Sequence, residues 1–278
     1  MQISLNTILL EPNRWSREKI PHRPIKQLLP MIKKYGFNEI ELWQYHISQF
    51  SHNQILNLAD FIANLDISCS VLGAYPALHL LGNVTKETHQ LNRLIQFAKI
   101  LDVKIFKIFA GNIASENLNA DQKRQAIRHL RLLASQLDSL GILLAIETHE
   151  NTLCDTLNNT EEVLSSLSLS NNVGCCFQPF MNHNTYEAKN CFDKIFPKII
   201  HIHLQNRKST KMDCCLLSEG DWIDYNELLP HFYKMGYKGD LSIEFTAKMA
   251  TPDNPNIPVE TVLENAVLDR NYILSLWQ

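Results

Sequence analysis

Three short apolar runs in the second half of the chain each carry residues that could do chemistry. They lie at 143–147, 200–205 and 241–245. The first run ends on Glu147, the last contains Glu244, and the middle one contains two histidines. In an extended strand, successive side chains alternate between the two faces. Each of these ionisable groups therefore shares a face with its neighbours two residues away, and the aliphatic residues of the middle run take the other face.

This pattern points to a metal site or to a salt-bridged polar core. His201, His203 and Gln205 share one face, and Glu41 lies on the face opposite to its aliphatic neighbours. Several carboxylates cannot all ionise in one dry pocket unless a cation balances them. Imidazole combined with carboxylate or amide oxygen suits Mn, Co, Zn, Mg or Fe. Both interpretations remain open from the residues alone.

The elements that must position these groups repeat along the whole chain. Eight apolar runs fit strands, each followed by a longer amphipathic segment: Gln2–Thr7, Asn38–Leu42, Ile67–Ala74, Val103–Phe109, Ile142–Glu147, Val173–Phe177, Lys198–Leu204 and Leu241–Phe245. Alternating strand and helix units of about 35 residues predict a parallel sheet, and eight of them predict closure into a barrel. A doubly wound open sheet is the alternative, but the chain has no G-x-G-x-x-G turn.

The clearest helix is predicted over residues 120–140. Its apolar residues recur every three or four positions, Asn119 and Gln122 can form a capping box, and Gly141 suits the stop. We therefore predict an α/β protein consisting of a single (β/α)8 TIM barrel domain, residues 1–278. In such barrels the functional groups come from the carboxyl ends of the strands and the loops that follow.

Composition limits the partners of this barrel. The net charge of −3 gives no electrostatic reason to expect nucleic acid or a membrane surface as partner. We find no apolar run near the ~20 residues that a membrane span needs, and the start does not resemble a signal peptide. The seven cysteines, without a C-x-x-C pair, predict free thiols in a reducing, cytoplasmic compartment.

Several segments together carry a family resemblance. They are Tyr35–Trp43, Ala145–His149, Ile200–Leu204, and Leu217–Asp224 leading to Gly236–Glu244. In their order and spacing the chain resembles the xylose isomerase-like TIM barrels. This group of sugar isomerases and epimerases is also called AP endonuclease family 2 and includes endonuclease IV. DNA repair is not expected here, because Met181 stands where the zinc site of that enzyme needs a histidine.

The resemblance implies a set of metal ligands. Carried over to this sequence, they are Glu147, Gln178, His203 and Glu244, and His201 is expected to pack behind the site. The cofactor implied is a divalent ion, Mn, Mg, Co or Zn. Two positions depart from the family pattern, because Gln178 and Gln205 stand where acids are usual. With less negative charge, the site should bind its metal more weakly or with an altered preference.

The activity implied is isomerisation or epimerisation of a small-molecule sugar or polyol through an enediolate. Glu147 and Glu244 would act as acid and base as well as ligands. A dehydratase or a hydrolase on the same metal site is an alternative, and so is a non-catalytic descendant that only binds a ligand. Related barrels form dimers or tetramers, so a homo-oligomer is possible. Candidate substrate contacts are Glu41, Trp43, His79, His149 and Arg207.

Overall fold

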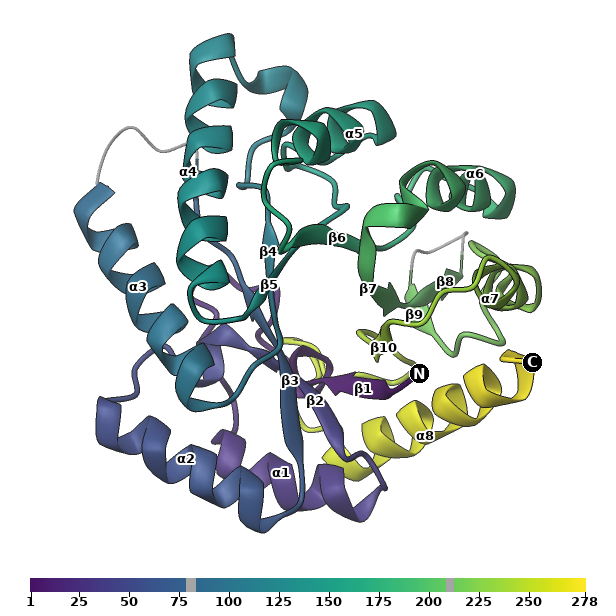
Figure 1. Cartoon of the computed structure of the whole chain (residues 1–278). Coiled ribbons are helices and arrows are strands. Elements are labelled where there is room, and N and C mark those ends of the chain that lie inside the picture. Colours follow the sequence, from purple (N-terminus) through teal and green to yellow (C-terminus); the bar gives the residue numbers. More distant parts are fainter. Residues whose placement is uncertain (79–83, 209–212) are drawn as a thin grey trace.

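The computed structural model describes residues 1–78, 84–208 and 213–278. Eight parallel strands close into a barrel in the order β1-β10-β7-β6-β5-β4-β3-β2 (Figure 1). The barrel strands are β1 (Ile3–Asn6), β2 (Glu39–Trp43), β3 (Ser68–Ala74), β4 (Ile105–Phe109), β5 (Leu143–Glu147), β6 (Val173–Phe177), β7 (Ile199–Leu204) and β10 (Asp240–Ile243). This arrangement confirms the predicted (β/α)8 barrel and not the open sheet.

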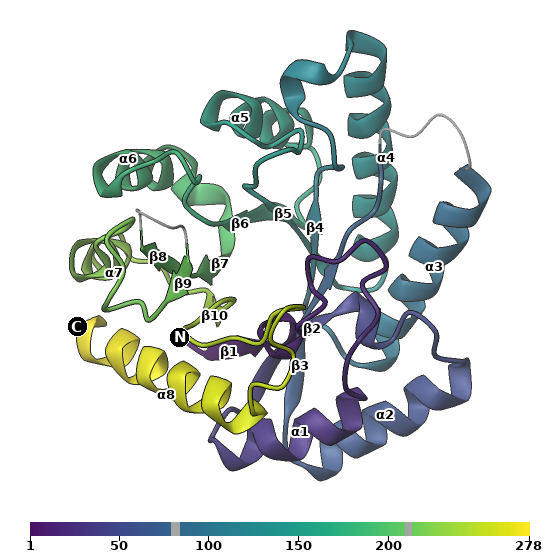
Figure 2. The ribbon, with the colours of Figure 1, turned by 180° about the vertical axis from the view of Figure 1, so that it is seen from behind.

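Helices follow the strands and form the outer ring, which is seen from two sides in Figures 1 and 2. They are α1 (Ile25–Lys34), α2 (His52–Asn64), α3 (Val84–Ile100), α4 (Ala120–Asp138), α5 (Leu157–Ser166), α6 (Thr185–Ile195), α7 (Tyr225–Lys234) and α8 (Val259–Leu276). The ring lets each helix bury its apolar face against the outside of the barrel.

The predicted elements agree with the structure to within two residues at each end. Helix α4 begins with the expected capping box, in which Asn119 and Gln122 each bond the other's backbone N–H. Gly141, which follows this helix, has a φ of 71°, a left-handed conformation that glycine adopts without strain. The last barrel strand ends at Ile243, two residues before its predicted end at Phe245. Glu244 therefore begins the loop, where it can face the opening of the barrel.

Two elements near the opening were not predicted. After β7 the chain forms a short antiparallel hairpin from β8 (Asn206–Lys208) and β9 (Asp213–Cys215). Its strands are too short and too polar to show apolar alternation, which explains why the sequence pattern did not reveal them. All seven cysteines are free thiols, as expected.

The barrel interior changes from apolar to polar along its axis. Val71, Ile105, Ala145 and Cys176 form a small separate cluster inside the barrel. Toward the carboxyl ends of the strands, the interior is filled by buried Glu41, Lys107, Glu147, His201 and His203. Within the described part of the chain, we find no helix long and apolar enough to span a membrane.

Candidate active site

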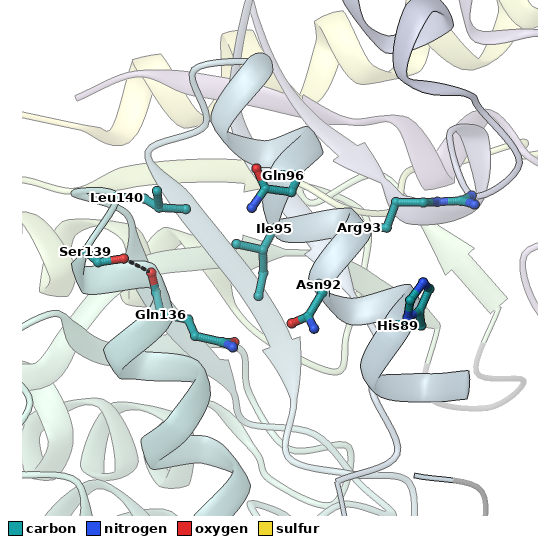
Figure 3. Close-up of a pocket in the computed structure, with 8 residues that line it drawn as sticks. All are labelled: His89, Asn92, Arg93, Ile95, Gln96, Gln136, Ser139 and Leu140. Atoms are coloured by element: carbon teal, nitrogen blue, oxygen red, sulfur yellow. Dashed lines mark hydrogen bonds between the residues drawn. The ribbon is translucent and has the colours of Figure 1, made fainter. Parts of the chain in front are cut away.

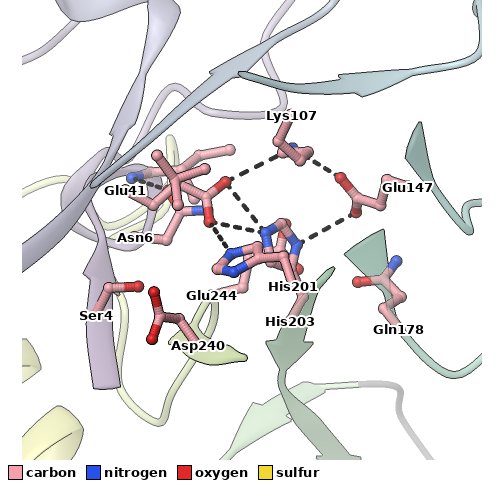
Figure 4. Close-up of polar contacts among 12 residues, drawn as sticks. Ser4, Asn6, Glu41, Lys107, Glu147, Gln178, His201, His203, Asp240 and Glu244 are labelled. Atoms are coloured by element: carbon pink, nitrogen blue, oxygen red, sulfur yellow. Dashed lines mark hydrogen bonds and ion pairs between the residues drawn. The ribbon is translucent and has the colours of Figure 1, made fainter. Parts of the chain in front are cut away.

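His203 lies at the centre of the polar cluster. Its Nε2 is 2.8 Å from an oxygen of Glu41. Its other nitrogen, Nδ1, is 3.3 Å from Glu147 Oε1 and 3.5 Å from Glu244 Oε1 (Figure 4). Strands β2, β5 and β7, together with the loop after β10, thus bring their ionisable groups to one point. This confirms that the groups singled out in the sequence converge on the barrel axis.

Glu41 fixes the orientation of both histidines. Its carboxylate is buried, and His201 Nε2 lies 3.0 Å from the oxygen that also contacts His203. Burial alone would raise the pKa of Glu41, but His203, His201 and Lys107 outweigh it and hold this pKa well below its usual range. An ionised carboxylate can only accept hydrogen bonds. The Nε2 of His203 therefore carries a proton, and its Nδ1 faces Glu147 and Glu244, whose charges, with those of Cys176 and Glu41, outweigh burial and raise the pKa of His203 well above its usual value.

Lys107 brings a positive charge into the same space. Its ammonium lies 2.7 Å from Glu147 Oε2 and 3.8 Å from Glu41 Oε1, and its side chain is fully buried. Burial alone would raise the pKa of Glu147, but Lys107 and then His203 outweigh it and lower this pKa to about 2. Burial also opposes the charge on Lys107, yet Glu147, Tyr75 and Glu41 raise its pKa well above normal. Lys107 and Glu147 are therefore a buried ion pair.

The neighbouring strand makes room for this lysine. Gly73 of β3 pairs with Lys107 of β4. A Cβ atom at position 73 would lie 3.2 Å from Glu41 Oε1 and 3.3 Å from Lys107 Cε, which is tighter than ordinary contacts. A side chain at this position would push the carboxylate and the lysine stem apart. The absence of a side chain at Gly73 thus allows Lys107 and Glu41 to share the barrel interior.

A row of amides connects the cluster to the cavity. Gln205 Nε2 donates to Gln178 Oε1 at 2.9 Å and to Glu244 Oε2 at 3.0 Å. Arg207 in turn donates to Gln205 Oε1 at 2.8 Å. The two glutamines at which the resemblance leads us to expect acids therefore contact each other. Gln178 presents its carbonyl oxygen beside Glu244, as a neutral oxygen ligand would.

The donor set fits a divalent cation. The ligand atoms of Glu147, His203 and Glu244 lie within 4.8 Å of one another. Two buried atoms of this set, His203 Nδ1 and Glu147 Oε1, face each other at 3.3 Å but form no hydrogen bond of good geometry. Buried polar atoms that are satisfied so poorly are rare in proteins. The carboxylate that orients the histidine from behind is also typical of metal centres, so these three residues, with Gln178 beside them, could hold the ion.

A second group of possible ligands is less suited to a metal. Cys176, His201 and His203 also lie within 4.8 Å of one another. However, the Nε2 atoms of both histidines already contact Glu41. Burial raises the pKa of the Cys176 thiol to about 12, so the thiolate that a metal needs is disfavoured. Of the two groups, the one that contains Glu147 and Glu244 is therefore better suited to hold a metal ion.

Above the cluster opens a cavity of about 700 Å³. Five residues predicted for the site line it: Trp43, His149, Gln178, Arg207 and Glu244. The other described ones, Glu41, Glu147 and His203, are buried below it. Glu41 therefore lies behind His203 and does not line the cavity, although it was predicted as a candidate substrate contact. His79 lies outside the described residues.

One wall of the cavity is aromatic. Phe109 stacks on His149 with ring centroids 4.2 Å apart, and Tyr75 meets Phe109 edge-on at 4.8 Å. Tyr45 and Trp43 continue the wall, with their centroids 4.8 Å apart. Such a surface can pack against the face of a sugar or carbocyclic ring. The sequence analysis had singled out Trp43 and His149 but not the other three rings.

Charged residues of the site that were not predicted from the sequence include Lys107 and Arg14. Lys107 interrupts the apolar strand Ile105–Phe109, and its register opposite Ala145 shows that it points into the barrel. A lone lysine flanked by apolar residues in a strand was the signal that could have revealed it. Arg14, in the loop after β1, lines the cavity although only 1% of the residue is exposed to solvent. No periodic pattern marks a loop residue of this kind.

A second cavity lies outside the barrel, and its lining residues do not suggest an active site. It has a volume of about 510 Å³ and lies between α3 and α4 (Figure 3). Among its eight lining residues, only His89 and Arg93 are titratable. The eight are His89, Asn92, Arg93, Ile95, Gln96, Gln136, Ser139 and Leu140. This second cavity lacks the convergent charges of the barrel opening.

Known proteins share this architecture. A 3-dehydroshikimate dehydratase from Bacillus anthracis is 21% identical over 178 residues, a match that spans 63% of each protein. A crystal structure of the probable 3-DHS dehydratase from Bacillus anthracis aligns with a TM-score of 0.75 at 17% identity, covering 98% of this chain and 99% of that one. D-psicose 3-epimerase from Clostridium cellulolyticum H10 aligns over the full length of both chains, with a TM-score of 0.78 at 14% identity.

A third structure was solved with a metal. It is a xylose isomerase-like TIM barrel protein from Mycobacterium smegmatis in complex with magnesium, with a TM-score of 0.72 at 17% identity over 99% of this chain and 96% of that one. At these identities the structures show a shared fold. The family follows from the sequence, because residues 29–263 match the xylose isomerase-like TIM barrel model. With this match and a closed eight-stranded barrel, the chain belongs to the xylose isomerase-like TIM barrel family.

Proposed function

We propose that this protein is a divalent-metal-dependent enzyme that enolises a polyhydroxylated substrate, as a sugar or polyol isomerase or epimerase does. The observation that carries the proposal is the convergence of three buried groups at the floor of the cavity, where His203 Nδ1 lies 3.3 Å from Glu147 Oε1 and 3.5 Å from Glu244 Oε1. Enzymes dominate the similar proteins, which include an epimerase and a dehydratase. Both names describe reactions that can begin with removal of a proton next to a carbonyl.

Glu147, His203 and Glu244, with Gln178, would hold the metal ion. When bound, the ion polarises the substrate carbonyl and so acidifies the neighbouring C–H bond. By accepting the proton of Nε2, Glu41 would keep Nδ1 of His203 directed at the ion. Gln205 holds Glu244 and Gln178 together through its amide.

The two glutamates differ in their suitability as a base. Lys107 keeps Glu147 ionised with a pKa of about 2, and Glu147 lies below the cavity. A carboxylate with so low a pKa is a weak general base near neutral pH. Glu244 borders the cavity and can reach a substrate C–H bond. We therefore assign the proton transfer to Glu244 and an anchoring role to Glu147.

This difference favours a dehydratase as the second candidate. An epimerase of this family removes a proton on one face of the substrate and returns one on the other, so it needs a group on each side. Of the two predicted acid and base groups, only Glu244 lines the cavity. A dehydratase can use one such group to remove the proton and then protonate the departing hydroxyl. The curated relative is a dehydratase.

Proton exchange in heavy water tests the proposal without knowledge of the product. The Mn²⁺-loaded protein is incubated with ketoses, inososes and cyclic hydroxy keto acids, and deuterium at carbon is followed by NMR. Incorporation that is lost in Glu244→Gln but retained in Glu161→Gln, on the exposed side of α5, supports enolisation. A new epimer identifies an epimerase, and loss of water identifies a dehydratase. No exchange with any of these compounds, in protein shown to contain metal, would overturn the proposal.

A further inference from the structure

The cavity wall opposite the aromatic rings is cationic. Arg14 and Lys19 from the loop after β1, and Arg207 from β8, line the cavity that also contains Glu244. The guanidinium carbons of Arg14 and Arg207 lie 5.8 Å and 6.0 Å from the same ring centroid, that of Phe245. We propose that Arg14 and Arg207 form a subsite for an oxyanionic group of the substrate, a carboxylate or a phosphate. The inference rests on the proposed function for the reaction and adds the charge of its substrate.

Arg14 is held in place more firmly than a surface arginine. It is 1% exposed and donates to the carbonyl oxygens of Glu11 and of Ala250, the latter at 2.9 Å. Its guanidinium stacks over Trp15, 4.4 Å from the ring centroid. These contacts fix the plane of the guanidinium before any ligand arrives. A fixed guanidinium matches the planar geometry of a carboxylate or a phosphate edge.

The guanidinium of Arg14 keeps an unused donor. Within residues 1–78, 84–208 and 213–278, its buried Nε has no hydrogen-bond acceptor. Burial lowers the pKa of this arginine to about 10; Cys214, Glu11 and Glu244 oppose this shift, and the nearby charge of Arg207 adds to it. The like charges of the two guanidiniums repel each other, and an anion bound between them would reduce this repulsion. An anionic ligand would relieve this repulsion and satisfy the free N–H of Arg14.

The aromatic wall and the cationic wall together indicate the chemical class of the ligand. The rings of Tyr75 and Phe109 can pack against an apolar ring face on one side. The two arginines can bind an anionic substituent on the other side, while Glu244 reaches the carbon skeleton between them. A cavity of about 700 Å³ accommodates a six-membered ring with such a substituent. The substrate class is therefore a hydroxylated cyclic acid or a sugar phosphate, and not a neutral sugar.

Two matched pairs of probes test the subsite by calorimetry on the full-length, metal-loaded protein. The first pair is shikimate and its methyl ester, and the second is sorbitol 6-phosphate and sorbitol. We expect one anionic member to bind at least tenfold more tightly than its neutral counterpart, and the pair that shows the preference identifies the anion. Arg207→Gln should abolish this preference without weakening the neutral probe. Arg128→Gln, an exposed arginine of α4, is the matched control and should change nothing.

Arg14→Gln should have the same effect as Arg207→Gln. Arg14 also donates to two backbone carbonyls, so its replacement by glutamine can disturb the loop. Arg14→Lys, which keeps the positive charge, is the second variant for that case. The proposal is overturned if neither anionic probe is preferred, if no probe binds, or if Arg207→Gln weakens acid and neutral probes equally. Binding does not depend on turnover, so a failure here is distinct from a failure of proton exchange.

Discussion

The ammonium of Lys107 lies 2.7 Å from a carboxylate oxygen of Glu147, and neither side chain is exposed to solvent. This ion pair gives the barrel a cation of its own at the floor of the site. Three buried carboxylates, those of Glu41, Glu147 and Glu244, surround His203. Lys107 offsets part of their mutual repulsion before any metal binds. It also competes with a metal for Glu147, so it should influence stability and metal affinity in opposite directions.

Replacement of Lys107 by methionine tests its effect on stability. Lys107→Met keeps the side-chain length but leaves Glu147 buried without its partner. Breaking a buried pair in this way costs about 3–5 kcal/mol, so we expect the free energy of unfolding without metal to fall by about that amount. Urea unfolding in the presence of a chelator measures it. With saturating Mn²⁺ the loss should be smaller, because the metal then compensates the charge of Glu147.

A double variant provides the control for this prediction. Lys107→Met combined with Glu147→Gln removes both charges, so it should recover most of the lost stability. Coupled neighbours typically show such non-additive effects. If the two losses simply add, the pair is not coupled and the assignment of Lys107 as partner of Glu147 is wrong.

Glu41 should control metal affinity without touching the metal. Glu41→Gln removes the acceptor that fixes the Nε2 proton of His203. Loss of such a supporting carboxylate typically costs 10–100-fold in metal affinity, and we expect a decrease in that range by competition with a chelating dye. Glu39→Gln, two residues earlier on the same strand β2, is the matched control. An equal loss in both variants would contradict the role of Glu41.

The sequence predicted the positions of the candidate site residues better than their environment. Strand alternation was enough to place Glu147, His203 and Glu244 at one end of the barrel, because strand ends meet there in this fold. Alternation could not reveal which buried charges pair. The contact between Lys107 and Glu41 depends on two strands that are not neighbours, and on the missing side chain at Gly73.

Loops were even less accessible to sequence reasoning. Arg14 is buried because the backbone carbonyls of Glu11 and Ala250 accept its hydrogen bonds. Ala250 is more than two hundred residues away in the chain, so no local sequence pattern could predict this contact. The same holds for the hairpin of β8 and β9, whose three-residue strands are too short for periodicity to show. Arginines that line the cavity could therefore be found only in the structure.

Protein stability should fall with rising pH because of Asp269. This buried residue of α8 accepts hydrogen bonds from Thr246 Oγ1 and from the backbone N–H of Leu217. Burial raises its pKa from the ordinary 3.8 to about 7. The folded state therefore binds more protons than the unfolded state between about pH 4 and pH 7. The resulting contribution to stability is fully present below pH 4 and is lost as the pH rises through 7.

At about 1.4 kcal/mol per pKa unit, this change amounts to roughly 4 kcal/mol. We expect the decline in unfolding free energy over this range, measured with urea, to be shallower in Asp269→Asn than in the wild type. Thr246→Val, which removes a donor that lowers the pKa of Asp269, should make the decline steeper. A wild-type slope in both variants would show that Asp269 does not titrate in this range.

Restoring an acid at position 178 tests whether that residue belongs to the metal site. Gln178 presents a neutral oxygen beside Glu244, joined to it through Gln205. Gln178→Asp adds one negative charge next to the metal, and carboxylate oxygens bind divalent ions more strongly than neutral amides. We expect the affinity for Mn²⁺ to rise by about tenfold or more, on the order of 1.4 kcal/mol in binding free energy. Gln178→Asn has the same shorter side chain without the charge and should not reproduce the gain. If Gln178→Asp binds the metal less tightly than the wild type, the ion lies away from β6, and Glu147, His203 and Glu244 hold it without a fourth protein ligand from that strand.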